Sequence, residues 1–258
     1  MSSTGSTGRY LYGLIRAAER VELGPIGLEH DGRPGRVYTL PAGPIAAVVS
    51  EYPAREKVLP LRKHLDPHHQ VIRAVMKTAT IVPMTFGHVA RSEAEITKAL
   101  RRNRDDIQAQ LDQVDGKVEM GLKVKWDVDN IFEYLVRVDP ALAALRDRIF
   151  GRSSAPSQAE KIELGQMFEE RLDQEREAQT DRVVDRFRPL SSDVKVNPPK
   201  HEKMVMDLAF LVDRGGLAPF EERVYQVAGT FPAEYLFDYT GPFAPFHFVD
   251  IHLQWAAA

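Results

Sequence analysis

The 258-residue sequence contains no cysteine. This absence excludes disulfide bonds, thiolate zinc sites, iron–sulfur clusters and cysteine nucleophiles, and it fits a reducing compartment. Long apolar runs are also missing, since no stretch approaches the roughly 20 residues that a membrane-spanning helix needs. The first eight residues, MSSTGSTG, lack the basic start and apolar run of a signal peptide, so we expect a disordered lead-in over residues 1–8. These absences predict a cytoplasmic protein without a membrane span.

A strong excess of charge of either sign is absent as well. The formal net charge is -3, and 43% of the residues are hydrophobic, which is typical of a globular chain. One short basic run, Arg101-Arg102-x-Arg104, is weak evidence for nucleic-acid binding in a net-acidic chain. We therefore expect no nucleic-acid partner.

The common catalytic and cofactor motifs do not occur. The sequence lacks GxxxxGK[ST], a GxGxxG after a strand, a GxSxG nucleophile elbow and HExxH. The segment Gly32-Arg33-Pro34-Gly35-Arg36 is basic and contains glycine, but proline-rich loops have this composition without binding anything. None of these motifs points to a catalytic site, and we expect no cofactor, but a catalytic triad assembled from distant residues stays open at the level of sequence.

Three histidines, His64, His68 and His69, fall within six residues. A metal site would need neutral imidazoles that converge, together with a third or fourth ligand. Pro67 intervenes between His64 and His68, which argues against a helical pair. His68 lies on the apolar face of the helix that we expect here, so a hydrogen-bonded core histidine is the ordinary explanation, and we expect no metal.

Residues 9–115 read as an N-terminal α+β domain. The segment RYLYGLI at 9–15 predicts a strand, the glycine- and proline-rich 22–35 predicts a loop, and 36–40 with 45–50 predict a hairpin. Asp66-Pro67 favours a helix start, with Asp66 as the N-cap. A strand over 80–86 and one helix opened by the Ser92-x-x-Glu95 capping box follow.

Residues 116–258 read as a C-terminal ferredoxin-like domain. Strict alternation of apolar and polar residues over 118–126 predicts a half-buried strand. Helices, strands over 193–196 and 204–212, a helix over 217–227 and a strand over 234–239 follow. This is the order of a ferredoxin-like β-α-β-β-α-β fold. Because the first half reads as a related sandwich, the predicted fold class is α+β with two ferredoxin-like domains.

A long helix is predicted from about residue 157 to 187. Its two ends are apolar, but between Leu172 and Val183 only Ala178 is apolar. A continuous apolar stripe is therefore missing from the middle, which should project into solvent or onto a partner. The charged residues considered for partner binding on this helix are Glu169, Glu170, Arg171, Arg176 and Arg182.

The last part of the chain, LFDYTGPFAPFHFVDIHLQW at 236–255, is rich in aromatic residues. Phe246 and Phe248 would share one face of a strand, whereas Ile251, Leu253 and Trp255 would share the other. The change of parity predicts a bulge or bend at Val249-Asp250, or a move to another surface. The histidines at 247 and 252 have opposite parity and make a poor ligand pair. This stretch is either a core strand or a binding surface.

Four segments resemble the gas vesicle protein F/L family (GvpF/GvpL) over nearly the whole chain. They are RYLYGLI, HHQVIRAVMKTATIVPMTFG, KVEMGLKVKWD with IFEYL, and LFDYTGPFAPFHFVDI. Similar proteins show a GPWPPY-like segment where this chain has Gly241-Pro242-Phe243-Ala244-Pro245-Phe246. Two aromatic residues are thus replaced by phenylalanine and one proline by alanine, which keeps the apolar surface but removes an indole N–H and a phenolic O–H.

The resemblance implies a non-enzymatic accessory or minor structural protein of gas vesicle assembly, located in the cytoplasm at the vesicles that give microbes buoyancy. It implies binding of the hydrophobic shell subunit GvpA, and of other gas vesicle proteins. The physical interpretation is compatible, because an apolar subunit needs partners that cover its exposed surface. The candidate binding residues of the aromatic stretch are Phe243, Phe246 and Phe248.

Two other function classes stay open at the level of sequence. One is a small-ligand- or metal-binding α+β enzyme, for which the three histidines would be the best site, since fold does not decide function. The other is a ligand-sensing regulatory module, which would need a concave pocket with convergent polar groups.

Overall fold

The computed structural model describes residues 7–54 and 56–255. The described residues of Met1–Glu119 and Pro242–Ala258 form one compact unit, unit 1, and Met120–Gly241 form unit 2. This division differs from the expected one, because the boundary lies within a strand after residue 115 and the last residues group with unit 1. Within the described residues, no helix combines the length and the apolar character that crossing a bilayer requires.

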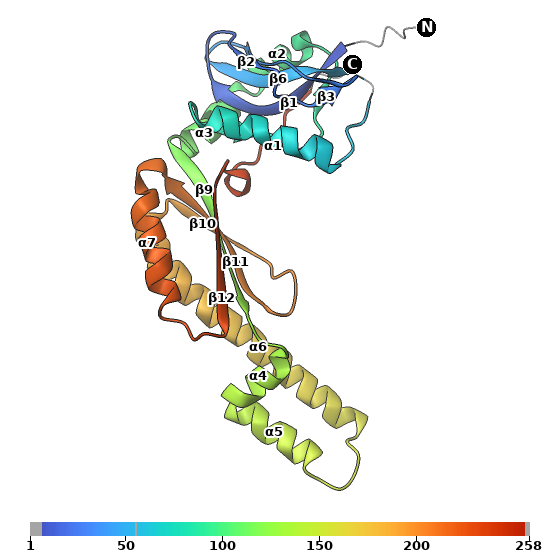
Figure 1. Ribbon diagram of the computed structural model, residues 1–258, viewed down its shortest axis with the longest axis vertical. Helices are drawn as coiled ribbons and strands as arrows, with labels where there is room; N and C mark the ends of the chain where they lie inside the picture. Colours follow the sequence, from blue (N-terminus) through green and yellow to red (C-terminus); the bar gives the residue numbers. More distant parts are fainter. Residues whose placement is uncertain (1–6, 55, 256–258) are drawn as a thin grey trace. The chain divides into compact units, whose positions relative to one another are not determined.

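Unit 1 is built on an antiparallel sheet with the strand order β2-β5-β6-β1-β7, in which β8 also pairs with β1 (Figure 1). A separate pair, β3 with β4, forms a small hairpin. The strands are β1 (Thr7–Arg16), β2 (Glu22–Gly24), β3 (Glu29–His30), β4 (Arg33–Pro34), β5 (Val37–Pro41), β6 (Ile45–Pro53), β7 (Ile81–Pro83) and β8 (Val89–Ala90).

The first strand and the following hairpin confirm the sequence prediction, and Pro83 ends an edge strand, where its missing N–H costs no ladder bond. Two details differ. The expected lead-in over 1–8 includes Thr7 and Gly8, which belong to β1, whereas residues 1–6 lie outside the described part. The expected loop over 22–35 contains the three short strands β2, β3 and β4.

Three helices complete unit 1: α1 (Arg62–Met76), α2 (Glu93–Arg102) and α3 (Arg104–Gln113). In β1, Tyr10 meets His68 of α1 and its neighbour Arg9 meets Glu93 of α2. Successive side chains of a strand point to opposite faces, so α1 and α2 cover opposite faces of the sheet (Figure 1).

Two helix predictions in unit 1 were wrong in their boundaries. Helix α1 begins at Arg62 with Leu61 as its N-cap, so Asp66 is not a cap and Pro67 lies inside the helix. The single helix expected after Ser92 is divided at Asn103, because the buried Asn103 side chain donates to the carbonyl of Ala99 and ends the first helix there. Ser92 does cap α2 by accepting from the Glu95 backbone N–H.

Unit 2 contains a four-stranded sheet with the order β10-β11-β9-β12. Its strands are β9 (Lys117–Trp126), which begins in unit 1, β10 (Asp193–Asn197), β11 (Met204–Asp213) and β12 (Tyr235–Phe243). The five apolar residues of β9 that alternate in the sequence are all buried, as predicted. Together with the helices, the element order of unit 2 is the predicted β-α-β-β-α-β order, with three helices in the first connection.

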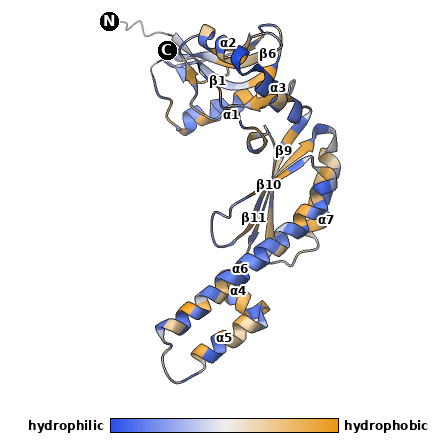
Figure 2. Ribbon diagram, turned by 180° about the vertical axis from the view of Figure 1, so that it is seen from behind, coloured by the Kyte–Doolittle hydropathy of each residue, from blue (hydrophilic) through white to orange (hydrophobic). Residues whose placement is uncertain are grey.

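The helices of unit 2 are α4 (Ile131–Val138), α5 (Pro140–Phe150), α6 (Gln158–Phe187) and α7 (Leu217–Ala228). Phe187 of α6, Phe210 of β11 and Phe220 of α7 form an aromatic core, with ring centroids 4.8 to 5.3 Å apart. The first half of α6 packs with α4 and α5, and α6 is largely hydrophilic (Figure 2).

Both units together confirm the predicted α+β class. In unit 1, however, six strands precede the first helix, so its order differs from β-α-β-β-α-β. Within the described residues there are also three short 3₁₀ helices: η1 (Arg188–Leu190), η2 (Arg214–Gly216) and η3 (Phe246–Phe248).

Candidate partner-binding surfaces

We call residues 242–255 the tail. Gly241, at the end of unit 2, has a φ of +125°, a backbone conformation that favours glycine, and β12 ends two residues later at Phe243. The chain then turns through η3, which the carbonyl of Pro245 closes by accepting from the N–H of Phe248. The predicted bend at Val249-Asp250 was wrong in position, because the chain leaves the strand geometry at Ala244, before the parity argument applies.

The three tail phenylalanines occupy different environments. Phe248 is buried, with 4% of its surface exposed, and the neighbouring Ala244 is buried as well. Phe246 is half-buried, and its ring lies 6.2 Å from the ring of His69 on α1. Phe243 keeps 43% of its surface exposed. The structure therefore assigns core packing to Phe248 and leaves Phe243, with part of Phe246, accessible.

A buried carboxylate fixes the turn of the tail. Glu119 of β9 is 5% exposed, and its two oxygens lie 2.9 Å from the backbone N and 2.7 Å from Nδ1 of His247. An ionised carboxylate only accepts hydrogen bonds, so both His247 groups donate. Because removing this carboxylate would leave two donors without a partner, the pair holds η3 against β9.

Two amides of unit 1 bind the rest of the tail. Gln110 of α3 accepts from the N–H of Asp250 at 3.1 Å. Asn103, at the junction of α2 and α3, accepts from the N–H of Gln254 at 3.2 Å and donates to its carbonyl at 3.5 Å. The tail is thus attached to unit 1 at three points along its length.

Between the tail and the edge of the unit 1 sheet lies a pocket of about 340 Å³. Most of its lining is apolar, and the polar exceptions are Thr85, His88, Asp250 and His252. The apolar lining consists of Pro83, Met84, Phe246, Val249, Ile251, Leu253 and Trp255. Ile251, Leu253 and Trp255 are only half-buried, so this part of the tail offers accessible apolar surface.

The three clustered histidines do not converge. Nδ1 of His64 lies 2.8 Å from the carbonyl oxygen of Leu59, His68 is buried, and His69 is exposed. In the described residues, no group of three or more histidine, aspartate or glutamate side chains is placed to hold a metal ion.

His68 is a core histidine, as the sequence predicted. The hydroxyl of Tyr10 accepts from the N–H of Gly87 at 3.1 Å and lies 2.9 Å from Nδ1 of His68, with which it shares a hydrogen bond. Burial, reinforced by the neighbouring His69, lowers the pKa of His68 to about 4. The imidazole is therefore neutral at pH 7 and belongs to the aromatic core under α1.

The three arginines of α6 that were considered for partner binding bond within unit 2. Nε of Arg171 lies 3.2 Å from Asp139. Arg176 donates to the carbonyl of Met204 at 3.0 Å and to that of Glu202 at 2.6 Å. Arg182 donates to Thr230 at 3.0 Å, and its guanidinium lies over the ring of Phe231. The two glutamates, Glu169 and Glu170, are exposed.

Sequence reasoning missed Glu119 and Asn103, although both position the tail. The alternation of β9 marks Glu119 as a solvent-facing residue, and no local pattern shows that the distant His247 covers it. Asn103 lies in the middle of a helical pattern, where an asparagine that bonds the backbone is the one available signal.

Comparison with known proteins gives a consistent result. The family described as gas vesicle synthesis protein GvpL/GvpF matches residues 8–250. Gas vesicle protein F of Nostoc sp. is 26% identical over 249 residues, covering 95% of this chain and 99% of that protein. Gas vesicle protein F of Haloferax mediterranei is 25% identical over 256 residues, covering 96% of each.

Solved structures agree with the sequence matches. The crystal structure of the gas vesicle protein GvpF from Anabaena sp. is similar with a TM-score of 0.83 and 26% identity, covering 96% of this chain and 100% of that chain. GvpF from Microcystis aeruginosa is similar with a TM-score of 0.77, 21% identity, and 95% and 99% coverage, which supports the fold alone.

Proposed function

Because the chain belongs to the gas vesicle synthesis family GvpL/GvpF and so has a role in gas vesicle formation, we propose that it is a non-enzymatic accessory or minor structural protein that binds the shell subunit GvpA. Its site of action is the cytoplasm, at the growing gas vesicle, where GvpA and other gas vesicle proteins are its partners. The binding step covers the apolar surface of GvpA before that surface enters the shell.

The observation that carries this proposal is the accessible apolar surface of the tail. Phe243 is 43% exposed, and Ile251, Leu253 and Trp255 line the tail pocket without being fully buried. Single exposed apolar residues are ordinary on any protein, but several grouped on one ordered segment are typical of a protein interaction site.

The roles of the candidate residues are distributed accordingly. Phe243 and Phe246 contact GvpA, and the buried Phe248 anchors the tail. On α6, Glu169 and Glu170 are the exposed charges that a partner can reach, whereas Arg171, Arg176 and Arg182 shape the helix surface through bonds within unit 2.

Site-specific photocrosslinking tests the proposal. The photoreactive amino acid p-benzoylphenylalanine is placed at position 243, at position 170 or, as a control, at position 225, where Tyr225 is a 70% exposed aromatic residue outside both surfaces. Each variant is co-expressed with GvpA and irradiated. A crosslink to GvpA from position 243, and none from position 225, is expected.

Two outcomes would overturn parts of the proposal. Equal crosslinking from positions 243 and 225 would show nonspecific contact. Crosslinking from position 170 but not from position 243 would move the binding surface to α6.

A further inference from the structure

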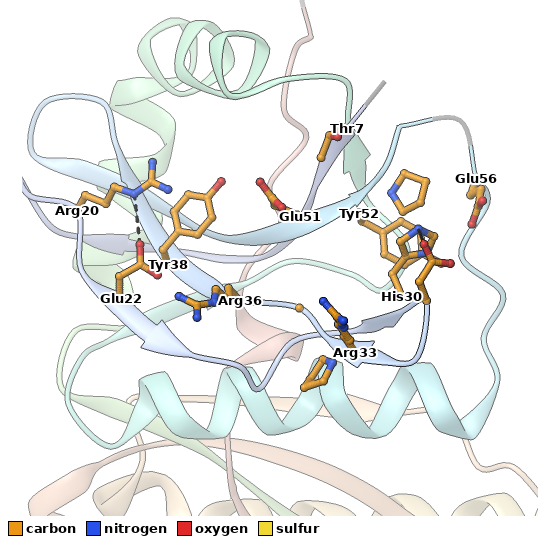
Figure 3. A pocket seen from close by; sticks show the side chains of 14 residues that line it. Thr7, Arg20, Glu22, His30, Arg33, Arg36, Tyr38, Glu51, Tyr52 and Glu56 are labelled. Atoms are coloured by element: carbon orange, nitrogen blue, oxygen red, sulfur yellow. Dashed lines mark ion pairs between the residues drawn. The ribbon is translucent and has the colours of Figure 1, made fainter. Parts of the chain in front are cut away.

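A second pocket of unit 1, of about 820 Å³, shares no residue with the tail pocket. It lies where the β3–β4 hairpin faces β2 and the ends of β5 and β6 (Figure 3). Tyr38 and Tyr52 are among the lining residues but are only 3% and 6% exposed, and charged side chains of both signs line the rest. This volume is large enough for several residues of a polypeptide.

One side of this pocket is already neutralised. The guanidinium of Arg20 lies 3.8 Å from the ring centroid of Tyr38 and 3.5 Å from Glu22. The hydroxyl of Tyr38 donates to Glu93 at 2.7 Å, and Glu93 also accepts from Arg9 at 3.2 Å. These groups satisfy one another and form a fixed wall.

Arg33 and Arg36 differ from Arg9 and Arg20 in lacking a carboxylate partner among the described residues. Both are exposed, and within 7–54 and 56–255 neither forms an ion pair with a carboxylate. Both line the pocket, and Figure 3 shows the Arg33 side chain beside the β3–β4 hairpin and the Arg36 guanidinium on the side of Glu22. A guanidinium presents a planar fork of donors that matches a carboxylate, so two unpaired forks in one pocket favour an acidic group of a ligand.

The backbone that carries these arginines is ordered. Gly27 donates to the carbonyl of Gly35 at 2.9 Å, and Gly35 donates to the carbonyl of Leu28 at 3.0 Å. Arg33 is paired with His30 across the β3–β4 hairpin. The two guanidinium groups are therefore attached to a fixed frame, which lowers the entropy cost of binding.

Carboxylates on the rim limit which ligands fit. Glu51 and Glu56 line the same pocket, and Glu51 lies 3.4 Å from Arg9. They repel a phosphate, which carries nearly two negative charges. They favour a ligand that pairs a single carboxylate with a nearby positive charge, and a polypeptide with acidic and basic side chains has this character.

We propose that this pocket binds an extended segment of a protein partner in which an acidic side chain inserts between Arg33 and Arg36 and a neighbouring basic side chain reaches Glu51 or Glu56. The site is separate from the tail and does not depend on which surface binds GvpA.

A peptide array tests this inference. Overlapping 12-residue peptides from GvpA and the other gas vesicle proteins of the same genome are probed with the purified chain. Peptides with an aspartate or glutamate near a lysine or arginine should bind. The double variant R33Q/R36Q should bind these peptides at least tenfold more weakly. The control variant R101Q/R102Q makes the same charge change on the exposed end of α2, outside the pocket, and should bind as the wild type does.

Charge reversal sharpens the test. The variant R33E/R36E should reject these peptides and bind versions in which the acidic residue is replaced by lysine. The inference is overturned if no peptide binds the wild type or if R33Q/R36Q binds the peptides like the wild type. It is also overturned if fully basic peptides bind equally well, or if millimolar inorganic phosphate displaces the peptides while acetate does not. GvpA crosslinking through position 243 reports on the proposed function independently of all these results.

Discussion

At the scale of single residues, Glu119 and His68 are two of the polar side chains buried in unit 1, and each is held by a partner distant in the sequence. Glu119 is buried because His247 returns to it from the far end of the chain. His68 is buried because Tyr10 satisfies its Nδ1 atom. The apolar face of the helix around His68 was visible in the sequence, so the burial of this histidine in the core was predictable. The burial of Glu119 was not, because its partner lies 128 positions away.

Replacing Glu119 with alanine should release the tail. The backbone N–H and Nδ1 of His247 would lose a charged acceptor, so we expect a loss of roughly 2–3 kcal/mol in the free energy that holds the tail. Hydrogen exchange of the amides at 246–254 should accelerate, while exchange in β11 stays unchanged. Glu177→Ala, at an exposed position of α6, is the control, and unchanged exchange at 246–254 in Glu119→Ala would contradict this role.

The low pKa of His68 predicts a pH dependence of stability. Because burial lowers this pKa from 6.5 to about 4, the unfolded chain takes up the proton at a higher pH than the folded protein. The stabilisation is complete above pH 6.5 and is lost as the pH falls toward 4. His68 should account for roughly 2 kcal/mol of lost stability between pH 7 and pH 5.

Urea unfolding at the two pH values measures this effect. The free energy of unfolding of His68→Leu should fall by roughly 2 kcal/mol less between pH 7 and pH 5 than that of the wild type. The exposed control His201→Leu should show the same fall as the wild type. An equal decline in wild type and His68→Leu would contradict the assignment.

At the scale of elements, predictions from repeating sequence patterns succeeded, whereas the predicted ends of the helices were less reliable. The alternation of β9 and the cap of α2 follow from a few neighbouring residues. Helix α1 starts five residues before Pro67, so Pro67 lies in the second turn and cannot donate a backbone N–H to the carbonyl of Lys63. The turn at η3 depends on contacts with Glu119, which no local pattern contains.

The capping box of α6 gives a test at this scale. The side chain of Ser157 accepts from the N–H of Glu160, and the Glu160 carboxylate accepts from the N–H of Ser157. Ser157→Ala should destabilise unit 2 by about 1 kcal/mol, as measured by urea unfolding. Ser154→Ala, in the preceding loop, should change stability by less than about 0.5 kcal/mol, and equal effects of both variants would contradict the cap.

Truncation of Phe248 and of Phe243 should affect the stability of the protein to different extents. Phe248→Ala removes a buried ring and should lower the free energy of unfolding by roughly 3 kcal/mol or more. Phe243→Ala removes an accessible ring and should change it by less than about 1 kcal/mol. Chemical denaturation of both variants checks this, and a large loss in Phe243→Ala would place that ring in the core.

At the scale of the whole molecule, the sequence carried the family and the α+β class. The segment RYLYGLI and the aromatic stretch resemble GvpF/GvpL, and the family match over residues 8–250 confirms the family. The division into units was not predictable, because Pro242 and Phe243 still belong to β12, whereas later tail residues bond to Glu119, Gln110 and Asn103 of unit 1. Chain order places the tail after unit 2, but packing groups it with unit 1.

The affinity for GvpA shows whether the tail is the surface that binds the shell subunit. The dissociation constant is measured for the wild type, for Phe243→Ala/Phe246→Ala and for the control Phe150→Ala/Tyr225→Ala, whose aromatic residues are 54% and 70% exposed outside the tail. The account predicts a folded tail variant that binds GvpA at least tenfold more weakly, and a control that binds like the wild type. A tail variant with unchanged affinity, or a control that alone loses it, would contradict the account.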